Sequence, residues 1–469
     1  MVNDGQRANG KGELATDNGL VGQSPNFFLA GCQSPMPNRD GRLYCGRSSV
    51  LRLAQPACFL VSGFAIIATY TVATLVPMLP LRVTAYTATS AAGHGTEALW
   101  EGLTQRRSRL RANDFPHCSL QTYIGRVDGV EDTQLPEAFA QWDCRNNRLA
   151  WLALNQDGLL RKIEAARDRY GSERIAVILG TSTASIGSSE DAYRERSSDT
   201  ELPAEYRRPI IHTPHSLSDF VRRVLDLHGP FLTVATACSS SARVFGSAER
   251  LIRCGLVDAA VVGGVDSLCL SVLYGFNALE LVSPQLCKPF DADRHGLNIG
   301  EAAGFALLER DAATGPWFSG YGETSDAYHM SSPHPEGEGA RRAMELAVTK
   351  AGLRPKDIDY VNLHGTATRM NDAMEAKAVK KLFVDGVACS STKAWTGHAL
   401  GAAGIVEAVV SLLCLERGMI PGTLNSSCSD TLLQDWLAFD NISRTLQRVM
   451  SNSFGFGGNN CALIFQNAA

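Results

Sequence analysis

The sequence lacks an excess of positive charge. Its 469 residues include 44 Lys and Arg against 48 Asp and Glu, which gives a formal net charge of −4. A protein that holds nucleic acid by neutralising phosphates needs a basic surplus, so we expect no nucleic-acid partner. With 45% hydrophobic and 20% charged residues, the chain is too apolar to stay unfolded, and we expect a globular protein.

The sequence also lacks cysteines paired in the manner of a zinc site. It contains 13 cysteines, but no two of them form a CxxC motif. Most lie in apolar stretches, as Cys269, Cys389, Cys414 and Cys461 do. Such cysteines are typical of reduced thiols that pack as small apolar side chains. We therefore expect a cytoplasmic protein without a bound metal.

The first 77 residues differ in character from the rest. Residues 1–56 are rich in Gly, Asn, Ser, Gln and Pro without periodicity, which predicts disorder. A run of 22 uncharged residues follows, from Ala57 to Met78, and it is long enough to span a bilayer. The run is either a membrane anchor or, as we favour, outside the working protein, with translation starting at Met78. The second hypothesis is favoured because the first expected strand begins at Leu81 and leaves no linker. Membrane association is expected only if residues 57–77 are retained.

From about residue 81 onward, short apolar runs alternate with amphipathic stretches. This alternation is typical of α/β proteins with mostly parallel central sheets, and its repetition in the second half is compatible with an internal duplication. We expect strands at 81–87, 174–179, 258–262 and 358–363, helices at 242–254, 341–351, 372–383 and 400–417, and a terminal hairpin of 448–453 with 461–465.

One candidate nucleophile stands where an expected strand gives way to a helix. From Phe231 the sequence reads FLTVATACSSS, so that an apolar strand leads into Cys238 and a helix begins just after it. The free amides and the dipole at a helix N-terminus favour the thiolate form. For the isolated motif, a buried structural cysteine is the alternative for Cys238, and helix capping is the alternative for the serines.

Two histidines follow expected strands in the second half. His364 lies in VNLHGTAT at the end of a strand, where ligands bind in open α/β sheets. Thr366 and Thr368 are expected either to bond an extended polar ligand or to cap the turn. His398 stands with Lys393 in STKAWTGHALGAAG, before a helix whose small residues allow close approach of a ligand or of another helix. A structural histidine and a surface lysine are the alternatives for His364 and Lys393.

Glycines gather in SNSFGFGGNN, from Ser451 to Asn460. We expect this turn to supply a backbone amide donor and a movable gate, although a simple hairpin turn also explains the glycines.

Cys238, His364 and His398 together suggest a nucleophile with two imidazole partners. A zinc site is the alternative, and we disfavour it because no two of these residues lie within four positions of each other. The interpretation requires a sulfur that is not buried and two rings within reach of it.

In combination, these motifs resemble those of the type II beta-ketoacyl-acyl-carrier-protein synthases, of the synthase I and II kind, in the thiolase-like condensing-enzyme superfamily. The resemblance extends from about Leu81 to Phe465. It rests on TACSSS, the DADR to GEAAG stretch (Asp291–Gly304), HGTAT with NDAME, STKAWTGHALGAAG and SNSFGFGGNN, in family order. It implies an α/β fold of two similar halves, residues 78–310 and 311–469, in a five-layered αβαβα arrangement, usually as a dimer.

The resemblance also implies roles for individual residues. Cys238 matches the nucleophile, His364 and His398 match the catalytic histidines, and Lys393 matches the lysine that supports them. The remaining implied roles are Glu375 and Asp372 as acids that order the site, Phe456 with its neighbour Phe454 as the gate, and Thr366 and Thr368 as holders of the phosphopantetheine arm.

The implied activity is transfer of an acyl group to Cys238, followed by decarboxylative condensation with malonyl-acyl-carrier protein in fatty-acid elongation. A specialised polyketide or aryl-polyene pigment synthase, paired with a non-catalytic subunit, is the alternative. No cofactor is implied beyond the phosphopantetheine that the acyl carrier protein brings. The chain departs from the family pattern at HGLNIGEAAG, which leaves the detail of that loop open.

An acidic carrier protein implies a basic docking patch on this chain. Arg145 and Arg148 are one candidate for it. A solvated face explains these arginines equally well. The second candidate, to which the same alternative applies, comprises Arg106, Arg107, Arg109 and Arg111.

Overall fold

The computed structural model describes residues 78–196, 198 and 201–467. The expected disorder of residues 1–56 and the apolar run up to residue 77 lie outside these residues and stay predictions, as does a start at Met78. Within the described residues, no helix is long and apolar enough to cross a membrane.

The first half contributes five main strands to a central sheet. They lie side by side in the order β1-β8-β7-β5-β6. The two pairs at the β6 end are parallel, and the two pairs at the β1 end are antiparallel. These strands are β1 (Leu81–Ser90), β5 (Ile175–Gly180), β6 (Phe231–Val234), β7 (Ala259–Asp266) and β8 (Ala302–Glu309).

The second half repeats this arrangement strand for strand. Its order is β9-β15-β14-β10-β11, again with two antiparallel pairs followed by two parallel pairs. If the strands of each half are numbered along the chain, both halves read 1-5-4-2-3, which identifies an internal duplication. These strands are β9 (Trp317–Ser325), β10 (Tyr360–Asn362), β11 (Ala388–Ser390), β14 (Arg448–Gly455) and β15 (Asn459–Gln466).

The two sets of strands join through a short antiparallel contact between β1 and β9, in which Leu81 pairs with Phe318. The expectation of mostly parallel sheets is confirmed, because four of the five main strands in each half run in the same direction. The last strand of each half is the exception and runs antiparallel to both of its neighbours. The expected boundary at residues 310/311 falls between β8 and β9, and as a domain boundary it stays a prediction.

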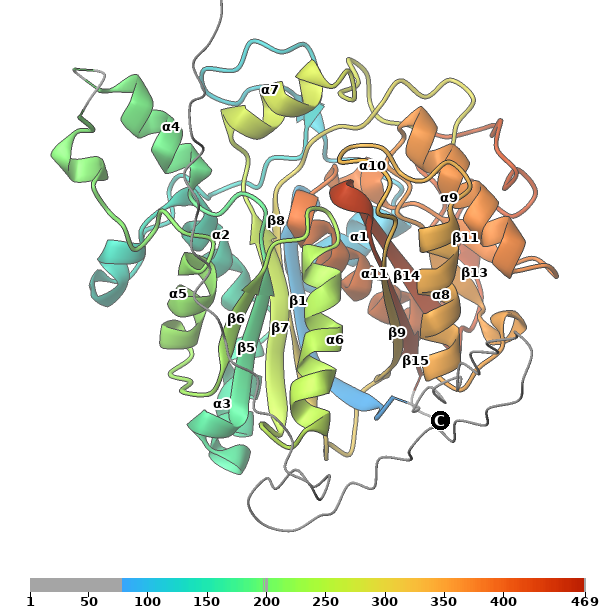
Figure 1. The fold of residues 1–469 in the computed structure, drawn as a ribbon, viewed down its shortest axis with the longest axis horizontal. Coiled ribbons are helices and arrows are strands. Elements are labelled where there is room, and N and C mark those ends of the chain that lie inside the picture. Colours follow the sequence, from blue (N-terminus) through green and yellow to red (C-terminus); the bar gives the residue numbers. More distant parts are fainter. Residues whose placement is uncertain (1–77, 197, 199–200, 468–469) are drawn as a thin grey trace, which may run out of the picture. The chain divides into compact units, whose positions relative to one another are not determined.

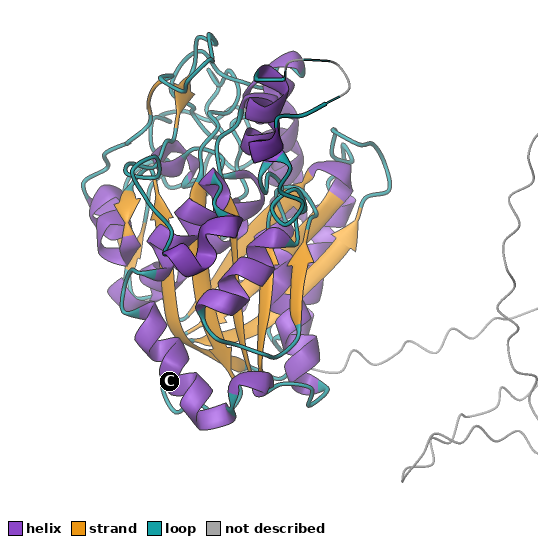
Figure 2. Ribbon diagram, turned by 90° about the vertical axis from the view of Figure 1, so that its left-hand side faces the viewer, coloured by secondary structure: helices purple, strands orange, loops and turns teal. Residues whose placement is uncertain are grey.

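Helices separate the two sets of strands and cover their outer faces (Figure 1 and Figure 2). Helix α6 (Ser240–Arg253) and helix α11 (Ala403–Arg417) pack against each other and against strands of both halves. Helices α2 (Arg145–Leu154), α3 (Leu159–Tyr170) and α5 (Ser216–Val224) pack on the first set, while α8 (Glu338–Lys350) packs on the second and α9 (Arg369–Leu382) packs on α8. The resulting order is the expected αβαβα layering.

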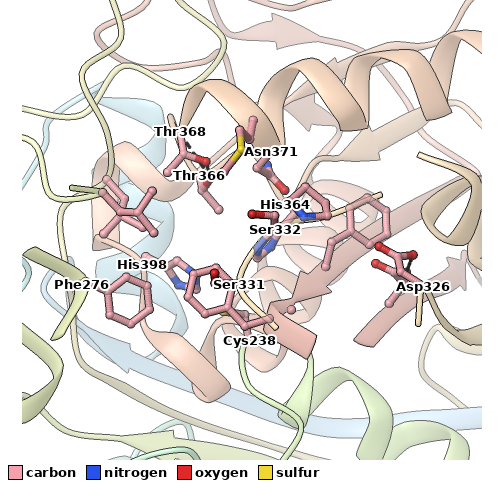
Figure 3. A pocket seen from close by; sticks show the side chains of 18 residues that line it. Cys238, Phe276, Asp326, Ser331, Ser332, His364, Thr366, Thr368, Asn371 and His398 are labelled. Atoms are coloured by element: carbon pink, nitrogen blue, oxygen red, sulfur yellow. Dashed lines mark hydrogen bonds between the residues drawn. The ribbon is translucent and has the colours of Figure 1, made fainter. Parts of the chain in front are cut away.

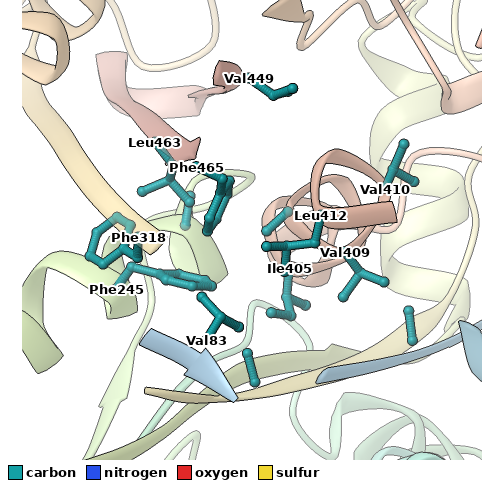
Figure 4. Packing of buried hydrophobic residues seen from close by; sticks show 14 of the residues in the cluster. Val83, Phe245, Phe318, Ile405, Val409, Val410, Leu412, Val449, Leu463 and Phe465 are labelled. Carbon is teal, nitrogen blue, oxygen red and sulfur yellow. The ribbon is translucent and has the colours of Figure 1, made fainter. Parts of the chain in front are cut away.

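The core between the layers is built from both halves. Phe245 of α6 contacts Phe318 of β9 and Phe465 of β15, with ring centroids 5.3 and 5.7 Å apart (Figure 4). Ile405, at the start of α11, is fully buried in the same cluster. Edge-on aromatic contacts of this kind add to the stabilisation from apolar burial.

Helices α6 and α11 meet at small residues, as the sequence predicts. A Cβ atom added to Gly404 would lie 2.7 Å from the backbone nitrogen of Ala242, so that any larger residue would push the helices apart. The amide of Ile405 donates to Ser241 Oγ across the same contact, at 2.9 Å. The crossing holds the ends of both helices, and the loops before them, in one place.

All the expected elements form, with ends that shift by a few residues. The largest difference is β7, which continues through Gly263 and Gly264 instead of ending there. A Cβ at Gly264 would lie 2.6 Å from Ser241 Cβ, so these glycines let α6 and β8 approach the strand. The elements that the sequence did not indicate include β2 (Gly93–His94), α1 (Gly95–Thr104), β3 (Arg111–Ala112), β4 (Tyr123–Ile124), α4 (Ile186–Arg194), α7 (Leu270–Ala278), α10 (Lys393–Thr396), β12 (Met419–Ile420) and β13 (Ile442–Ser443).

Candidate active site

Cys238 lies in the tight corner between β6 and α6. The preceding residue, Ala237, has a φ of +51°, a left-handed conformation that residues with side chains seldom adopt. The corner is held by the amide of Thr236, which donates to Ser240 Oγ at 2.9 Å. This strained turn places the thiol at the N-terminus of α6, as the sequence predicts.

The sulfur is nevertheless buried, with Cys238 only 5% exposed. Burial raises the pKa of the thiol to about 11, although the charge of Lys393 and the backbone amides of Phe456 and Cys238 act in the opposite direction. The expectation of an accessible, ionised sulfur was therefore wrong. Helix-end effects favour the thiolate, but the loss of water around the sulfur outweighs them. The sulfur still lines a pocket, so a substrate that enters the pocket meets it.

Both predicted histidines lie beside this thiol. His364 follows β10, and His398 stands between α10 and a 3₁₀ turn (Leu400–Ala402). One ligand atom from each of Cys238, His364 and His398 lies within 4.8 Å of the other two (Figure 3). The two rings are nearly perpendicular, with centroids 5.4 Å apart. Residues distant in sequence thus form one compact group.

Hydrogen bonds define which ring nitrogen carries the proton. The amide of Leu400 donates to His398 Nδ1 at 3.1 Å, and Lys393 Nζ lies 3.3 Å from His364 Nδ1. Since both Nδ1 atoms face donors, each neutral ring carries its proton on Nε2. Burial, and then the charge of Lys393, lower the pKa of both imidazoles well below its usual value. Two neutral N–H donors are therefore available to a ligand.

The same hydrogen bonds argue against a zinc site at these three residues. A histidine that binds zinc through Nε2 normally donates its Nδ1 proton to an acceptor. Here both Nδ1 atoms face donors instead, one of them a cation. The arrangement is suited to donating hydrogen bonds from Nε2, and it fits a metal poorly.

Lys393 is buried and links His364 to Glu407. Its ammonium donates to the backbone oxygen of His364 and to a carboxylate oxygen of Glu407, on α11. Burial raises the pKa of Glu407 to about 7. The sequence analysis missed Glu407, although an acid in the middle of an apolar stretch of a helix is a visible signal.

The two predicted acids order the loop that carries His364. Glu375 accepts hydrogen bonds from the amides of His364 and Gly365, at 2.9 and 2.8 Å. Asp372 accepts from the amide of Phe290 at 2.7 Å. Both carboxyl groups are fully buried, and burial raises their pKa values to about 7 and about 6. They support the site from outside the pocket.

The glycine-rich turn brings two phenylalanines to the pocket. Phe454 lies edge-on to His364, while the Phe456 ring stacks on Phe276 of α7, with centroids 5.5 Å apart and an interplanar angle of 15°. A Cβ at Gly455 would lie 3.1 Å from the Cys238 nitrogen, a tight contact that any larger residue could relieve only by shifting the turn away from the thiol. Phe276 was missed, because no local pattern separates it from a core residue.

The predicted threonines also reach the pocket. Thr366 and Thr368 line it, and their hydroxyl groups lie 2.9 Å apart. The sequence analysis missed a segment on the other side, which follows β9 and contacts the gate turn through a hydrogen bond from Gly457 N to the Met330 oxygen at 2.7 Å. Pocket residues that it missed include Asp326, Ser331, Ser332, Pro333, Met370 and Asn371.

The arginines proposed for docking are mostly engaged in ion pairs. Arg145 binds the fully buried Glu301 through two hydrogen bonds, of 2.6 and 2.8 Å, and it also pairs with Glu131. Arg148 pairs with Asp143. The prediction for Arg145 was wrong, because it holds the loop around Glu301 from inside. In the second cluster, Arg106 and Arg111 also pair with acids, while Arg107 and Arg109 are exposed.

The duplicated strand order, the two central helices and the Cys-His-His pocket define a thiolase-like condensing-enzyme fold. The model of the beta-ketoacyl synthase N-terminal domain matches residues 79–313, and that of the C-terminal domain matches residues 317–427. The chain therefore belongs to the beta-ketoacyl synthase family.

Individual relatives agree with this family. A 3-oxoacyl-[acyl-carrier-protein] synthase 2 of Rhizobium meliloti is 41% identical over 51% of this chain, and nodulation protein E of Rhizobium sp. (strain N33) is 31% identical over 80% of the chain and 96% of that relative. A solved ketosynthase from Xenorhabdus doucetiae, in complex with its chain length factor, is 37% identical over 83% of this chain and 98% of its own, with a TM-score of 0.74.

Two of the alignments are partial. The match with the Rhizobium meliloti synthase spans 61% of that protein, and a match with a mitochondrial synthase of Arabidopsis thaliana spans 56%.

Proposed function

We propose that this protein is a 3-oxoacyl-[acyl-carrier-protein] synthase, which joins an acyl group held on Cys238 to a malonyl group held on a carrier. The observation that carries the proposal is the convergence of one thiol and two neutral imidazoles, all within 4.8 Å of one another, in a single buried pocket.

The first step is acyl transfer. The Cys238 sulfur, once deprotonated, attacks the thioester carbon of the acyl carrier; a new S–C bond forms, the old one breaks, and the carrier thiol leaves with a proton. The backbone amides of Cys238 and Phe456, which interact with this sulfur, are placed to stabilise the oxyanion. Such a donor contributes on the order of 3 kcal/mol. Because the resting thiol has a raised pKa, the thiolate is a minor species before substrate enters.

The second step is decarboxylation and condensation. The bond between the malonyl carboxylate and its α-carbon breaks, CO₂ leaves, and the electron pair passes to an enolate. The Nε2–H groups of His364 and His398 donate to the thioester oxygen and stabilise this charge. The α-carbon then attacks the acyl carbonyl on Cys238, and the thiolate departs from a product two carbons longer. No cofactor is needed beyond the phosphopantetheine arm of the acyl carrier protein, which Thr366 and Thr368 are placed to hold.

The partner in this reaction is an acyl carrier protein, and we expect the chain to act as a dimer. Among the described residues, no strand covers the outer edge of β6, and Leu232 on that strand is 45% exposed. An open edge is able to pair with another strand. Pairing of β6 with its counterpart in a second copy would extend the sheet through both molecules.

A specialised polyketide pathway is the second candidate. It is favoured by the Xenorhabdus doucetiae ketosynthase, which is 37% identical over almost its whole length and is described with a chain length factor. In that case the open β6 edge would pair with a non-catalytic subunit instead of a second copy.

The decisive experiment compares the wild type with Cys238→Ala. Mass spectrometry of the protein after incubation with a mixture of acyl-carrier substrates is expected to show acylated Cys238, and the preferred acyl group separates the two pathways. The variant is expected to lose acyl transfer while malonyl decarboxylation survives or rises. Cys254→Ala is the matched control, because Cys254 is exposed at the far end of α6. Condensation at the wild-type rate in Cys238→Ala would refute the proposal.

A further inference from the structure

Helix α7 is weakly anchored for a helix that contributes to the pocket. Its sequence, LSVLYGFNA, is apolar nearly all round, yet Leu273 is the one residue of the helix that is fully buried. Tyr274 is 38% exposed, and Leu279, just after the helix, is 49% exposed. A helix with few buried contacts opens at low cost in free energy. Leu273 packs in an apolar cluster, with Val272 and Phe276 against it, and specific polar contacts add to this limited anchorage.

Two polar contacts hold α7. At its middle, the Tyr274 hydroxyl accepts a hydrogen bond from the amide of Ser119 at 3.1 Å. At its N-terminus, both carboxylate oxygens of Glu190, on α4, accept hydrogen bonds from free backbone amides. The amide of Leu270 donates at 2.9 Å and that of Ser271 at 2.6 Å.

The contact at Glu190 is the stronger of the two. A carboxylate that accepts from the first amides of a helix gains from charge-assisted hydrogen bonds and from the helix dipole. The residue that precedes the helix, Cys269, has no capping hydrogen bond from its own side chain. Glu190 thus takes the place of a local cap, from a helix about eighty residues earlier in the chain.

Helix α7 carries this contact to the reaction centre through Phe276. The Phe276 ring lies edge-on to His398, with centroids 6.5 Å apart (Figure 3). It also stacks on Phe456, with centroids 5.5 Å apart. The Phe456 amide in turn interacts with the Cys238 sulfur. A shift of α7 would therefore remove one side of the aromatic pair that lines the pocket together with the thiol.

We propose that Glu190 is a positioning residue that clamps α7, and through Phe276 keeps the aromatic pair closed over Cys238. Only the effect of this clamp on catalysis rests on the proposed function. The contacts of Glu190 with α7 and of Phe276 with Phe456 are present whatever reaction the protein catalyses. Release of the clamp enlarges the pocket at the Phe276 side, which favours bulkier groups on the thiol.

The test compares Glu190→Ala and Glu190→Gln with Asp191→Asn, in the full chain and without any carrier. Asp191 is the neighbouring acid on α4 and pairs with Arg194 at 2.7 Å. Asp191→Asn therefore removes one negative charge from α4, as the Glu190 variants do, without removing a contact with α7. Hydrogen exchange of residues 270–278 is expected to rise about tenfold in Glu190→Ala, and less in Glu190→Gln, which retains one acceptor oxygen. Exchange in β7 is expected to stay unchanged.

The second readout is alkylation of Cys238 by N-ethylmaleimide, relative to the exposed Cys254 and Cys428. Glu190→Ala is expected to accelerate it about tenfold, and the effect should vanish in a Phe276→Ala background, where the cover is already absent. Exchange or alkylation equal to that of Asp191→Asn would overturn the proposal, and so would a rise in exchange that includes β7. These readouts need no synthase activity, so failure of the clamp and failure of the proposed reaction are separate outcomes.

Discussion

The two halves of the molecule share one strand order but finish their outer edges differently. In the second half, the edge of β11 is covered: the Cys389 amide donates to the Trp436 oxygen at 3.0 Å, and the Ala438 amide donates to the Cys389 oxygen at 2.8 Å. Within the described residues, nothing pairs in this way with β6. A duplicated scaffold has thus kept one edge free, and unpaired backbone groups on such an edge favour assembly.

The halves also place different chemistry at equivalent positions. The connection from the third strand to the central helix carries Cys238 in the first half, and Lys393 with His398 in the second. The connection between the fourth and fifth strands carries Phe276 in the first half and Phe456 in the second, and these two rings stack. Because the halves face each other across α6 and α11, equivalent loops meet in one pocket. In the proposed reaction, the first half supplies the nucleophile and the second half supplies the imidazole hydrogen-bond donors.

The sharpest test of this division is His364→Ala. Loss of one donor to the enolate is expected to lower malonyl decarboxylation by about 10²- to 10³-fold. Formation of acyl-Cys238 should change far less, because the first half supplies the nucleophile. Decarboxylation assays and mass spectrometry measure the two steps separately. His295→Ala, at an exposed histidine, is the control, and wild-type decarboxylation in His364→Ala would end the assignment.

The second largest effect is expected at the open edge of β6, which has no counterpart at the covered edge of β11. Leu232→Lys places a charge on the open strand, where the same residue of a second copy would lie nearby. The dimer dissociation constant is expected to rise about a hundredfold, because like charges at a contact cost several kcal/mol. Sedimentation equilibrium measures it. Leu256→Lys, at an exposed leucine away from any strand edge, should leave assembly intact. Equal behaviour of the two variants would mean that β6 is not the contact.

A smaller effect is expected from removing the positive charge of Lys393, which belongs to the second half and lowers the pKa of Cys238 in the first half. Since the pKa of Cys238 is raised to about 11, the thiolate fraction and the rate of alkylation by iodoacetamide should increase with pH, about tenfold per unit below pH 11. The charge of Lys393 lowers this pKa, so its removal should slow alkylation at pH 9 by about tenfold.

The variant for this test is Lys393→Met combined with Glu407→Gln, which leaves no buried charge unpaired. Alkylation at the wild-type rate across the pH range would show that the ammonium does not act on the sulfur.

The smallest effect tests the helix crossing that joins the halves. Gly404→Ala adds a methyl group 2.7 Å from the Ala242 nitrogen, and it is expected to lower the free energy of unfolding by about 1–2 kcal/mol. Urea unfolding provides the measurement. Gly275→Ala is the control, since no atom lies within 4 Å of its added Cβ and alanine favours a helix. If the two variants proved equally stable, the crossing would be looser than described.

Much of the fold followed from local patterns. The continuous apolar run at 174–179 became β5, which is buried on both faces, and the periodic stretch at 341–351 became α8, because burial on one face of a helix leaves a readable period. Strand direction followed only in part. The predicted hairpin gave the antiparallel pairing of β14 with β15. Neither β8 nor its antiparallel direction was predicted, because short apolar strands read alike whether their neighbours run parallel or antiparallel.

The site shows the same limit at the level of single residues. Cys238, His364 and His398 stand at strand ends or helix starts that the sequence marks clearly, and the family resemblance supports each of them. Phe276 and Glu190 carry no such mark, because their importance depends on partners that are distant along the chain. Arg145 misled, since a charged residue on a helix reads the same whether it faces solvent or a buried acid such as Glu301.

By itself, the sequence determined which residues occupy the corners and turns of the duplicated sheets, because those positions depend on short-range periodicity, glycine conformation and motif order. Only the tertiary structure decided the protonation of the group. Burial keeps Cys238 a thiol and both imidazoles neutral. Because hydrogen-bond donors face the Nδ1 atom of each ring, each imidazole carries its own proton on Nε2. The loss of water around a side chain and the tautomer of a histidine depend on which residues surround it in space. The order of residues along the chain does not show which residues those are.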